Sequence, residues 1–411
     1  MTATESVTFD DIEAAISRLD DETVVKRTPV ERSTSLGERV GGEVFLKMEH
    51  LQWTGSFKTR GAYNKLARCV AEGEIEHAVA ASAGNHAQGV ALAATTLGVD
   101  STIVMPKTAP QTKIDATRGY GATVTLHGQD FQTAMAHAKE LTEGGDSTFV
   151  HAYDDPDIVA GQGTLGIEMA EDCPGVDTVV VPIGGGGLIS GIALAFSELA
   201  PDVRIIGVQA EKAATVPESL DKGIPQTLDS VDTIADGIAT GGVSELTLGI
   251  IDEHVDEIVT VSDSGIANAV LLLLERAKQL VEGAGAAGVA AILSDDLDVE
   301  GETVMALLCG GNLDMTMLQT VLVHALTDRQ QLVHLRVKIE DIPGRMAEIS
   351  TLISEHDANI RAVRHDRAVE NLDVGEAYLV FRIETSGIQH SRAITDAIEE
   401  SGYDVTIVNT R

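Results

Sequence analysis

The chain has 411 residues, enough for two or three domains, and its 64 acidic against 29 basic residues give a net charge of -35. This balance argues against a nucleic-acid surface and against docking on an anionic membrane, since both need clustered Lys and Arg. Scattered acids are typical of proteins that stay soluble in concentrated salt, so we expect a halophile-like, salt-loving cytoplasm. The three cysteines are too few and too scattered for a disulfide framework or a zinc site. We also find no apolar run of membrane-spanning length and no secretory signal.

From about residue 40 to 323, short apolar runs alternate with helical segments and glycine turns. In chain order, the predicted elements are strand 77–84, helix 86–98, strand 101–106, strand 122–128, helix 130–143, strand 147–153, strand 177–182, helix 188–200, strand 203–210 and strand 302–310. This alternation is typical of parallel strands with helices on both faces of the sheet. Ligands of such sheets bind at the carboxyl ends of the strands, where the glycine turns fall.

The last part of the chain follows a different pattern, in which apolar and polar residues alternate as in strands with one exposed face. The predicted elements are strand 332–339, a turn at 341–345, a helix around 346–353, strand 376–383, helix 388–402 and strand 404–408. Their order is read as βαββαβ, the ferredoxin-like arrangement. We therefore expect an α/β domain at 1–323, a linker at 324–331 and a small ferredoxin-like domain at 332–411.

A glycine-rich turn, Gly184–Gly187, stands between strand 177–182 and the next helix. Consecutive glycines let several backbone N–H groups point at one anion, with the N-terminus of the helix behind them. The turn lacks the Lys-Ser/Thr of a Walker loop, and Ile189 and Ser190 stand where a dinucleotide fingerprint needs its third glycine. We favour a phosphate cradle over a turn without a ligand, because a mere turn rarely needs four glycines.

Two further segments carry polar residues of interest. Lys58 lies between Phe57 and a Gly-Ala pair, and such neighbours would desolvate the amine and lower its pKa, as a Schiff-base lysine requires. Spacing alone makes this a weak signal against the simpler reading of a solvated lysine. The turn at 82–86 suits a carboxylate, but Ser82 or Asn85 could equally be an ordinary helix cap.

Seven motifs together resemble those of threonine dehydratases, also called threonine ammonia-lyases, which are pyridoxal-phosphate (PLP) enzymes of the tryptophan-synthase-β fold type. In order, the motifs are GSFKTRGA (55–62), SAGNHAQG (82–89), AGQGT (160–164), GGGGL (184–188), ADGIA (235–239), EGAGA (282–286) and CGGN (309–312). The resemblance covers roughly residues 20–320 and implies the two-lobed, open parallel-sheet fold of PLP fold type II. The C-terminal unit, with DIPGR at 341–345, resembles an ACT domain, a small amino-acid sensor.

For the cofactor, the resemblance implies that Lys58 forms the Schiff base and also removes the substrate's α-proton. Phe57 would lie against the pyridine ring, and Asn85 would hydrogen-bond the ring hydroxyl. The phosphate would be held by the glycine turn and the residue after it, Gly184, Gly185, Gly186, Gly187 and Leu188. Cys309 would face the pyridine nitrogen, where a thiol protonates the ring less strongly than the aspartate of other PLP enzymes and so favours prompt loss of the β-hydroxyl.

For the substrate, the resemblance implies that one turn binds the carboxylate through the Ser82 side chain and the backbone of Ala83, Gly84, Asn85 and His86. Gly237 and Glu282 would border the ring and the substrate. Serine racemases of this fold carry a second serine at the position of Ala83, so its absence here argues for dehydration without racemisation. Gln209 and Thr215 stand where those relatives bind a divalent cation, so we expect no tight metal site and leave room for a loosely bound monovalent cation.

The leading hypothesis is a PLP-dependent ammonia-lyase that converts L-threonine to 2-oxobutanoate and ammonia, as the first step toward isoleucine. L-serine is the nearest rival substrate, because one methyl group contributes only about 1–3 kcal/mol of discrimination. A catalytically inert amino-acid sensor is a second alternative, and a nucleotide-dependent oxidoreductase is disfavoured by the failed fingerprint.

In the C-terminal unit, we expect an amino-acid effector such as isoleucine or valine at the turn formed by Asp341, Ile342 and Gly344. Ligands of ACT domains commonly lie between paired copies, so the resemblance implies a homo-oligomer. A domain used only for assembly is the alternative.

Overall fold

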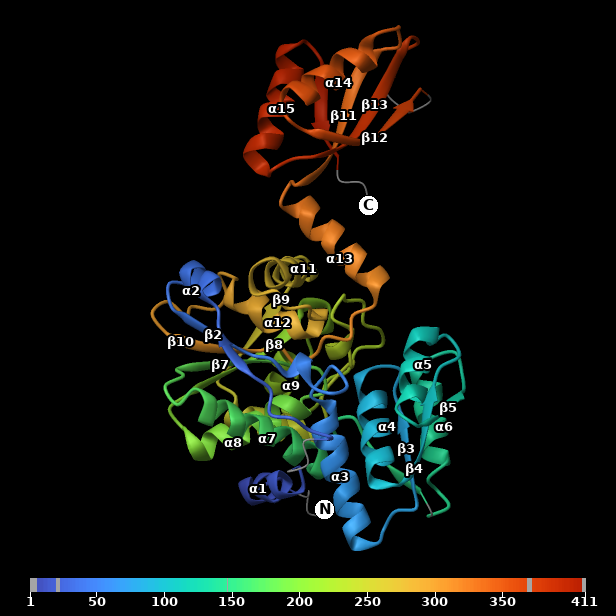
Figure 1. The fold of residues 1–411 in the computed structure, drawn as a ribbon, viewed down its shortest axis with the longest axis vertical. Coiled ribbons are helices and arrows are strands. Elements are labelled where there is room, and N and C mark those ends of the chain that lie inside the picture. The colour runs from blue at the N-terminus through green and yellow to red at the C-terminus, as the bar shows by residue number, and fades with distance from the viewer. Residues whose placement is uncertain (1–5, 20–22, 146, 368–371, 409–411) are drawn as a thin grey trace. The chain divides into compact units, whose positions relative to one another are not determined.

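The computed structural model describes residues 6–19, 23–145, 147–367 and 372–408 (Figure 1). The chain divides into two compact units, with the boundary between Asp314 and Met315. The segment expected to be a linker, 324–331, therefore falls in the second unit, where residues 324–328 end helix α13 (Met315–Asp328). Residues 1–5 and 409–411, at the outer ends of the two expected domains, lie outside the described residues.

The first unit contains a six-stranded sheet in the order β1-β2-β10-β7-β8-β9. Its strands are β1 (Val30–Arg32), β2 (Glu43–Lys47), β10 (Thr303–Leu307), β7 (Thr178–Pro182), β8 (Arg204–Ala210) and β9 (Glu257–Val261). All neighbours are parallel except β1, which pairs antiparallel with β2. Helices cover both faces, because Val180 lies against Gly288 of α12 (Gly283–Ile292) whereas Gly207 lies against Ile189 of α8 (Gly187–Leu199).

The other helices near this sheet and its loops belong to the same unit. They are α1 (Phe9–Arg18), α2 (Thr34–Val40), the turn η1 (Glu49–Leu51), α7 (Pro156–Asp172), η2 (Glu211–Ala213), α9 (Val216–Lys222), η3 (Asp236–Ile238), α10 (Glu245–His254), α11 (Asp263–Leu272) and η4 (Leu273–Ala277). Capping side chains begin several of them; Asp155, for example, accepts hydrogen bonds from the backbone of Asp157 and Ile158 at the start of α7.

A second, all-parallel sheet of four strands forms the other lobe of the first unit, in the order β5-β4-β3-β6. Its elements are α3 (Lys58–Glu72), β3 (His77–Ala81), α4 (Asn85–Leu97), β4 (Asp100–Met105), α5 (Gln111–Gly119), β5 (Thr123–Leu126), α6 (Phe131–Glu140) and β6 (Ser147–Phe149). Alternate residues of β3 pack on opposite sides: Ala78 and Ala80 share a cluster with α4, and Val79 and Ala81 one with α6. This two-lobed α/β architecture agrees with the expected fold class.

The second unit has the expected order βαββαβ after α13. Its elements are β11 (Leu332–Glu340), α14 (Arg345–Glu355), β12 (Asn359–Asp366), β13 (Glu376–Glu384), α15 (Ile388–Glu400) and β14 (Asp404–Ile407). The antiparallel sheet has the order β12-β13-β11-β14. Alternate residues of β11, such as Leu335 and Val337, pack with Ile349 of α14 and Ile394 of α15, so one face of the sheet forms the core.

Candidate active site

Several of the predicted site residues of the first unit lie at turns that follow its strands. The turn after β3 leads into α4 at Asn85, and the glycine turn after β7 leads into α8 at Gly187. Cys309 follows β10, and its carbonyl accepts a hydrogen bond from the backbone N–H of Phe57 at 3.3 Å. Carboxyl ends of parallel strands are where open α/β sheets bind ligands.

Lys58 is the first residue of α3 and is half-buried. Its Nζ donates to the carbonyl of Ala152 at 3.0 Å and lies 5.0 Å from the centre of the Phe57 ring. Burial lowers the pKa of Lys58 to about 8, and the nearby Cys309 and Glu282 oppose the shift. The neutral amine, which is the nucleophilic form, is therefore far more populated near neutral pH than in a solvated lysine.

Glu282 is 8% exposed and lies beside Asn85, whose Nδ2 donates to its Oε1 at 2.7 Å. Burial raises the pKa of Glu282 to about 7, against the lowering effect of the Asn85 hydrogen bond. Asn312 donates to Asn85 Oδ1 at 2.9 Å and to the carbonyl of Thr54 at 2.6 Å. These bonds fix the orientation of the Asn85 amide, with its NH₂ group toward Glu282.

The turn between β3 and α4 has the open backbone that a carboxylate site needs. Ser82 Oγ accepts from the backbone N–H of Gly84 at 3.1 Å, and a Cβ added to Gly84 would have no atom within 4 Å. His86 is buried and its Nε2 donates to the carbonyl of Val150 at 2.9 Å. Burial, followed by the charge of Lys58, lowers the pKa of His86 to about 3, so its imidazole is a neutral structural partner.

The glycine turn leaves no room for side chains. A Cβ on Gly185 would lie 2.1 Å from Cδ1 of Tyr153, and one on Gly184 would lie 3.0 Å from the Cα of Ile238. Gly186 has φ +89°, a conformation that side chains disfavour. The Gly185 carbonyl accepts from Thr247 Oγ1 at 2.9 Å, which anchors the turn. A close-fitting backbone at the start of a thirteen-residue helix is suited to a phosphate.

Gly237 and Cys309 border the same region. A Cβ on Gly237 would lie 3.0 Å from Glu282 Oε1, and one on Gly310, next to Cys309, would lie 2.2 Å from the same atom. Burial, followed by the charge of Glu282, raises the pKa of the Cys309 thiol well above its usual range, so the thiol is neutral. A neutral thiol cannot supply a full negative charge to a bound group.

A hydrogen bond joins Asn85 to Glu282, and Glu282 and Cys309 lie close enough to Lys58 to influence its pKa. The 152–153 segment joins Lys58 to the glycine turn, because Ala152 accepts from Lys58 and Tyr153 lies against Gly185. Tyr153 was not predicted from the sequence, because no local pattern marks it. Asn312 could have been found, since it is the last residue of the CGGN motif. Gln209 Oε1 accepts from the backbone N–H groups of Thr215 and Val216 at 3.0 and 2.9 Å, so its amide oxygen is occupied by the start of α9.

The predicted effector residues lie in the second unit, at the turn between β11 and α14. The Asp341 carboxylate is bound by Arg367 Nε at 2.6 Å and lies 3.2 Å from His365 Nε2. Ile342 is 51% exposed, and Gly344, with φ +103°, stands at the start of α14. The Asp341 charge is therefore already compensated, whereas the rest of the turn is open.

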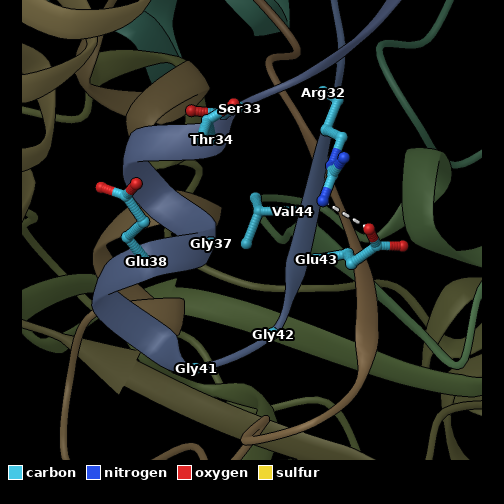
Figure 2. A pocket seen from close by; sticks show the side chains of 9 residues that line it. All are labelled: Arg32, Ser33, Thr34, Gly37, Glu38, Gly41, Gly42, Glu43 and Val44. Carbon is cyan, nitrogen blue, oxygen red and sulfur yellow. Dashed lines mark ion pairs between the residues drawn. The ribbon is translucent and has the colours of Figure 1, made fainter.

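Figure 2 shows a cavity of about 180 Å³ between α2 and β2. Its lining residues are Arg32, Ser33, Thr34, Gly37, Glu38, Gly41, Gly42, Glu43 and Val44. None of them is a predicted site residue, and Arg32 is paired with Glu43 at 2.5 Å.

Among the described residues, none of the helices is long and apolar enough to cross a membrane. Within the same residues, no group of three His, Cys, Asp or Glu side chains is placed to hold a metal ion.

Residues 22–310 match the family model of pyridoxal-phosphate dependent enzymes, and the chain belongs to this family. An L-threonine ammonia-lyase of Thermotoga maritima is 44% identical over 98% of this chain and 100% of its own length. Among solved structures, the processed threonine deaminase isoform 2 of Solanum lycopersicum has a TM-score of 0.74 at 35% identity and covers 79% of this chain and 92% of its own. Maize serine racemase has a TM-score of 0.73 at 34% identity, covering 79% and 99%.

The described residues suit this cofactor on two independent observations. One is the half-buried amine of Lys58, with its pKa lowered to about 8. The other is the glycine turn, where a Cβ at any of the four glycines would clash with a neighbour or strain the backbone. PLP supplies an electron sink for the substrate's α-carbon. In this cofactor's site Lys58 would hold the aldehyde, Gly184–Leu188 the phosphate and Asn85 the ring hydroxyl, the roles that the sequence resemblance implies.

Proposed function

We propose that the chain deaminates L-threonine, releasing 2-oxobutanoate and ammonia. The observation that carries the proposal is the group formed by Lys58, Asn85 and Glu282 beside the glycine turn. The named activity of the Thermotoga maritima relative, which matches nearly the whole chain, supports the choice of reaction.

In this proposal Lys58 Nζ takes the α-proton of the substrate, and its lowered pKa makes that transfer efficient near neutral pH. The Ser82 hydroxyl and the backbone N–H groups of Ala83 to His86 hold the substrate carboxylate. Asn85, whose amide is oriented by Asn312, would hold the ring hydroxyl, and the neutral Cys309 thiol would lie toward the ring nitrogen. Gly237 and Glu282 close the side of the site around the bound substrate.

The test is 2-oxo acid release from L-threonine in concentrated KCl by wild type and by Lys58→Ala. We expect turnover by wild type and a loss of at least about 10³-fold in Lys58→Ala, because both the covalent attachment and the base are removed. Lys107→Ala is the matched control, because Lys107 is exposed in a turn, and it should leave turnover unchanged. Full activity of Lys58→Ala would refute the proposal. So would the absence of 2-oxo acid release from L-threonine by wild type that has PLP bound.

L-serine is the second candidate substrate, supported by the likeness to a serine racemase and by the small energetic difference of one methyl group. Parallel assays with both amino acids decide between them through the ratio of kcat/KM. Because Ala83 supplies no hydroxyl as an acid on the opposite face, we propose dehydration without racemisation. Formation of D-serine from L-serine would contradict that part.

For the second unit, we propose an ACT-type amino-acid sensor with the effector bound at the turn of Asp341, Ile342 and Gly344. The exposed Ile342 and the open start of α14 support a ligand there, and the Arg367–Asp341 pair would be the contact that a ligand rearranges. Isoleucine or valine should then shift threonine saturation by about 5- to 150-fold in affinity. No shift by either ligand would leave assembly of a homo-oligomer as the unit's role.

The proposed setting is a salt-rich cytoplasm, where the reaction is the first step toward isoleucine. A monovalent cation is proposed to bind loosely, and replacing KCl by a tetramethylammonium salt at equal ionic strength tests it. Loss of activity in that exchange supports the cation, and unchanged activity removes it.

A further inference from the structure

The AGQGT motif, Ala160–Thr164, has no place among the residues that face the proposed cofactor, yet all five of its residues are buried. It lies in the middle of α7, which contacts both α3 and α8 (Figure 1). These two helices begin at the two groups that matter most to the site: α3 begins at Lys58, and α8 begins at Gly187 of the glycine turn.

On one side of α7, the backbone of the motif packs directly against the backbone of the first turn of α3. A Cβ on Gly161 would lie 2.6 Å from the Cα of Gly61 and 2.8 Å from the carbonyl oxygen of Arg60. Gln162 Oε1 accepts from the backbone N–H of Gly61 at 3.3 Å, and Thr164 Oγ1 accepts from Arg60 Nη1 at 3.2 Å. All of these contacts are made two or three residues after Lys58.

On the other side, the motif meets α8 in the same way. A Cβ on Gly191 of α8 would lie 2.4 Å from the carbonyl oxygen of Val159 and 2.5 Å from the backbone nitrogen of Gly163. One turn further along α7, a Cβ on Gly166 would lie 2.8 Å from the Cβ of Ala195. The helix that begins at the glycine turn is thus also seated on the backbone of α7.

Gly161 and Gly163 are two residues apart, and two residues correspond to roughly 200° around an α-helix. The two contacts therefore lie on opposite sides of α7, and the helix separates α3 from α8 by its own backbone width. We propose that the AGQGT segment of α7 is a spacer that sets the distance between the Lys58 amine and the phosphate-binding glycine turn. Gly61, Gly161, Gly163 and Gly191 are positioning residues in this arrangement, and the proposal rests on the function proposed above.

A methyl group at such a contact cannot be absorbed by a flexible side chain, because the opposing atoms are backbone. Restoring ordinary contact at Gly161 or Gly191 requires a shift of about 1 Å, and a misplacement of that size can cost about 100-fold in rate. The two glycines control different helices, so their replacement by alanine should damage different properties of the site.

The experiment compares Gly161→Ala and Gly191→Ala with Gly249→Ala, a control in α10 whose added Cβ meets nothing within 4 Å. Each holoprotein is reduced with borohydride, and mass spectrometry of its peptides gives the fraction of Lys58 that carries the cofactor. Dissociation constants are measured for PLP and for pyridoxamine 5′-phosphate, which has no aldehyde and so reports the phosphate and ring contacts without the lysine. Far-UV circular dichroism and Tm show that each variant is folded.

For Gly161→Ala we expect a displaced lysine: the trapped fraction of Lys58 falls at saturating PLP, kcat falls about 100-fold, and the affinity for pyridoxamine 5′-phosphate stays within about 3-fold of wild type. For Gly191→Ala we expect a displaced glycine turn, with both affinities lowered by at least about 10-fold. Gly249→Ala should match wild type in every readout. If Gly161→Ala does not fold, Gln162→Met removes the acceptor of the Gly61 N–H at similar volume and should lower the trapped fraction alone.

The spacer proposal would be overturned if Gly161→Ala and Gly191→Ala both lost the trapped fraction of Lys58 and the affinity for pyridoxamine 5′-phosphate to the same extent. A general loosening of the core would explain such a result. The spacer would also be overturned if folded Gly161→Ala kept the wild-type trapped fraction of Lys58 and an unchanged kcat. That result would leave the proposed function intact. Borohydride attachment to a different lysine in wild type would instead refute the assignment of Lys58, and the spacer proposal would fall with it.

Discussion

At the scale of single residues, the site combines groups whose protonation is controlled by burial. Lys58 has a lowered pKa, Glu282 a raised one, and the thiol of Cys309 is neutral, and Lys58 and Glu282 are close enough to shift each other's pKa. Opposite shifts in neighbouring groups are typical of sites where protons are moved. Only Lys58 among the three could be picked from the sequence on chemical grounds, since its aromatic and small neighbours pointed to desolvation.

Glu282→Gln should remove a pH-dependent part of the stability. The pKa of Glu282 in the folded protein is about 7, above its ordinary value of 4.5. Between these two pH values the native state therefore keeps a proton that the unfolded chain has already released. The stabilisation is complete below pH 4.5 and is lost as pH rises toward 7. Relative to Glu282→Gln, the cofactor-free wild type should therefore lose about 2–3 kcal/mol of unfolding free energy over that window.

Urea unfolding of both proteins at constant salt, measured at half-unit intervals of pH, gives this difference directly. Parallel curves from pH 5 to pH 8 would show that Glu282 titrates in its ordinary range. Asp236→Asn is a suitable companion, because Asp236 raises the pKa of Glu282 and its removal should move the window downward.

At the scale of elements, a network of buried charges joins β2, η1, α3 and α7. Arg60 Nε lies 2.6 Å from Glu49 and its Nη1 2.7 Å from Glu168, while Lys47 lies 2.8 Å from Glu168 and 2.9 Å from Asp172. The side chains of Arg60, Glu49 and Lys47 are 1%, 0% and 0% exposed. Water cannot replace a lost partner there, so the network holds α3 and α7 in one relative position.

Arg60→Met should therefore cost about 3–5 kcal/mol of unfolding free energy, because it leaves Glu49 buried without its cation. The exposed pair Lys222–Glu218 in α9 provides the control, and Lys222→Met should cost less than about 1 kcal/mol. Denaturant unfolding of both variants measures the contrast. Comparable losses in the two would mean that Glu49 finds another partner or takes up a proton.

The elements also show what the sequence could predict and why the rest escaped it. Strands such as β7 were recognisable because all five residues are buried and three consecutive valines, 179–181, form the centre of the run. The predicted order βαββαβ includes β12, but the sequence did not give its residue range. Most of its residues are exposed, and a bulge between Ile360 and Ala362 breaks the alternation. β9 was missed because its burial is interrupted, and the role of α7 was missed because contacts between backbones leave no periodic signal.

At the scale of the whole molecule, the negative charge is distributed unevenly. The unit from Met315 to Arg411 holds 10 of the 29 basic residues and 15 of the 64 acidic ones, so most of the excess lies in the first unit. Like charges on one surface repel each other, and salt screens them over about 10 Å at 0.1 M but about 3 Å at 1 M. The first unit should therefore be the salt-requiring part.

The single tryptophan, Trp53, reports on that unit alone, and it is 50% exposed. We expect the thermal midpoint followed by its fluorescence to rise steadily from 0.1 to 2 M KCl, because screening removes repulsion from the native state. Far-UV circular dichroism reports on both units. A thermal transition that it shows but the fluorescence does not belongs to the second unit, and its midpoint should shift less with KCl. A midpoint independent of KCl would contradict the halophilic interpretation of the composition.

The crossings of α7 with α3 and α8 also bear on how such a protein can change its specificity over generations. In the proposed arrangement, glycine backbones set the placement of the groups that hold the cofactor, so this placement does not depend on the side chains of the proposed substrate turn. Gly84, where an added Cβ meets nothing within 4 Å, and its neighbour Ala83 lie outside those crossings. Selection can therefore alter the pocket for the amino acid one residue at a time, while the inherited cofactor frame stays the same.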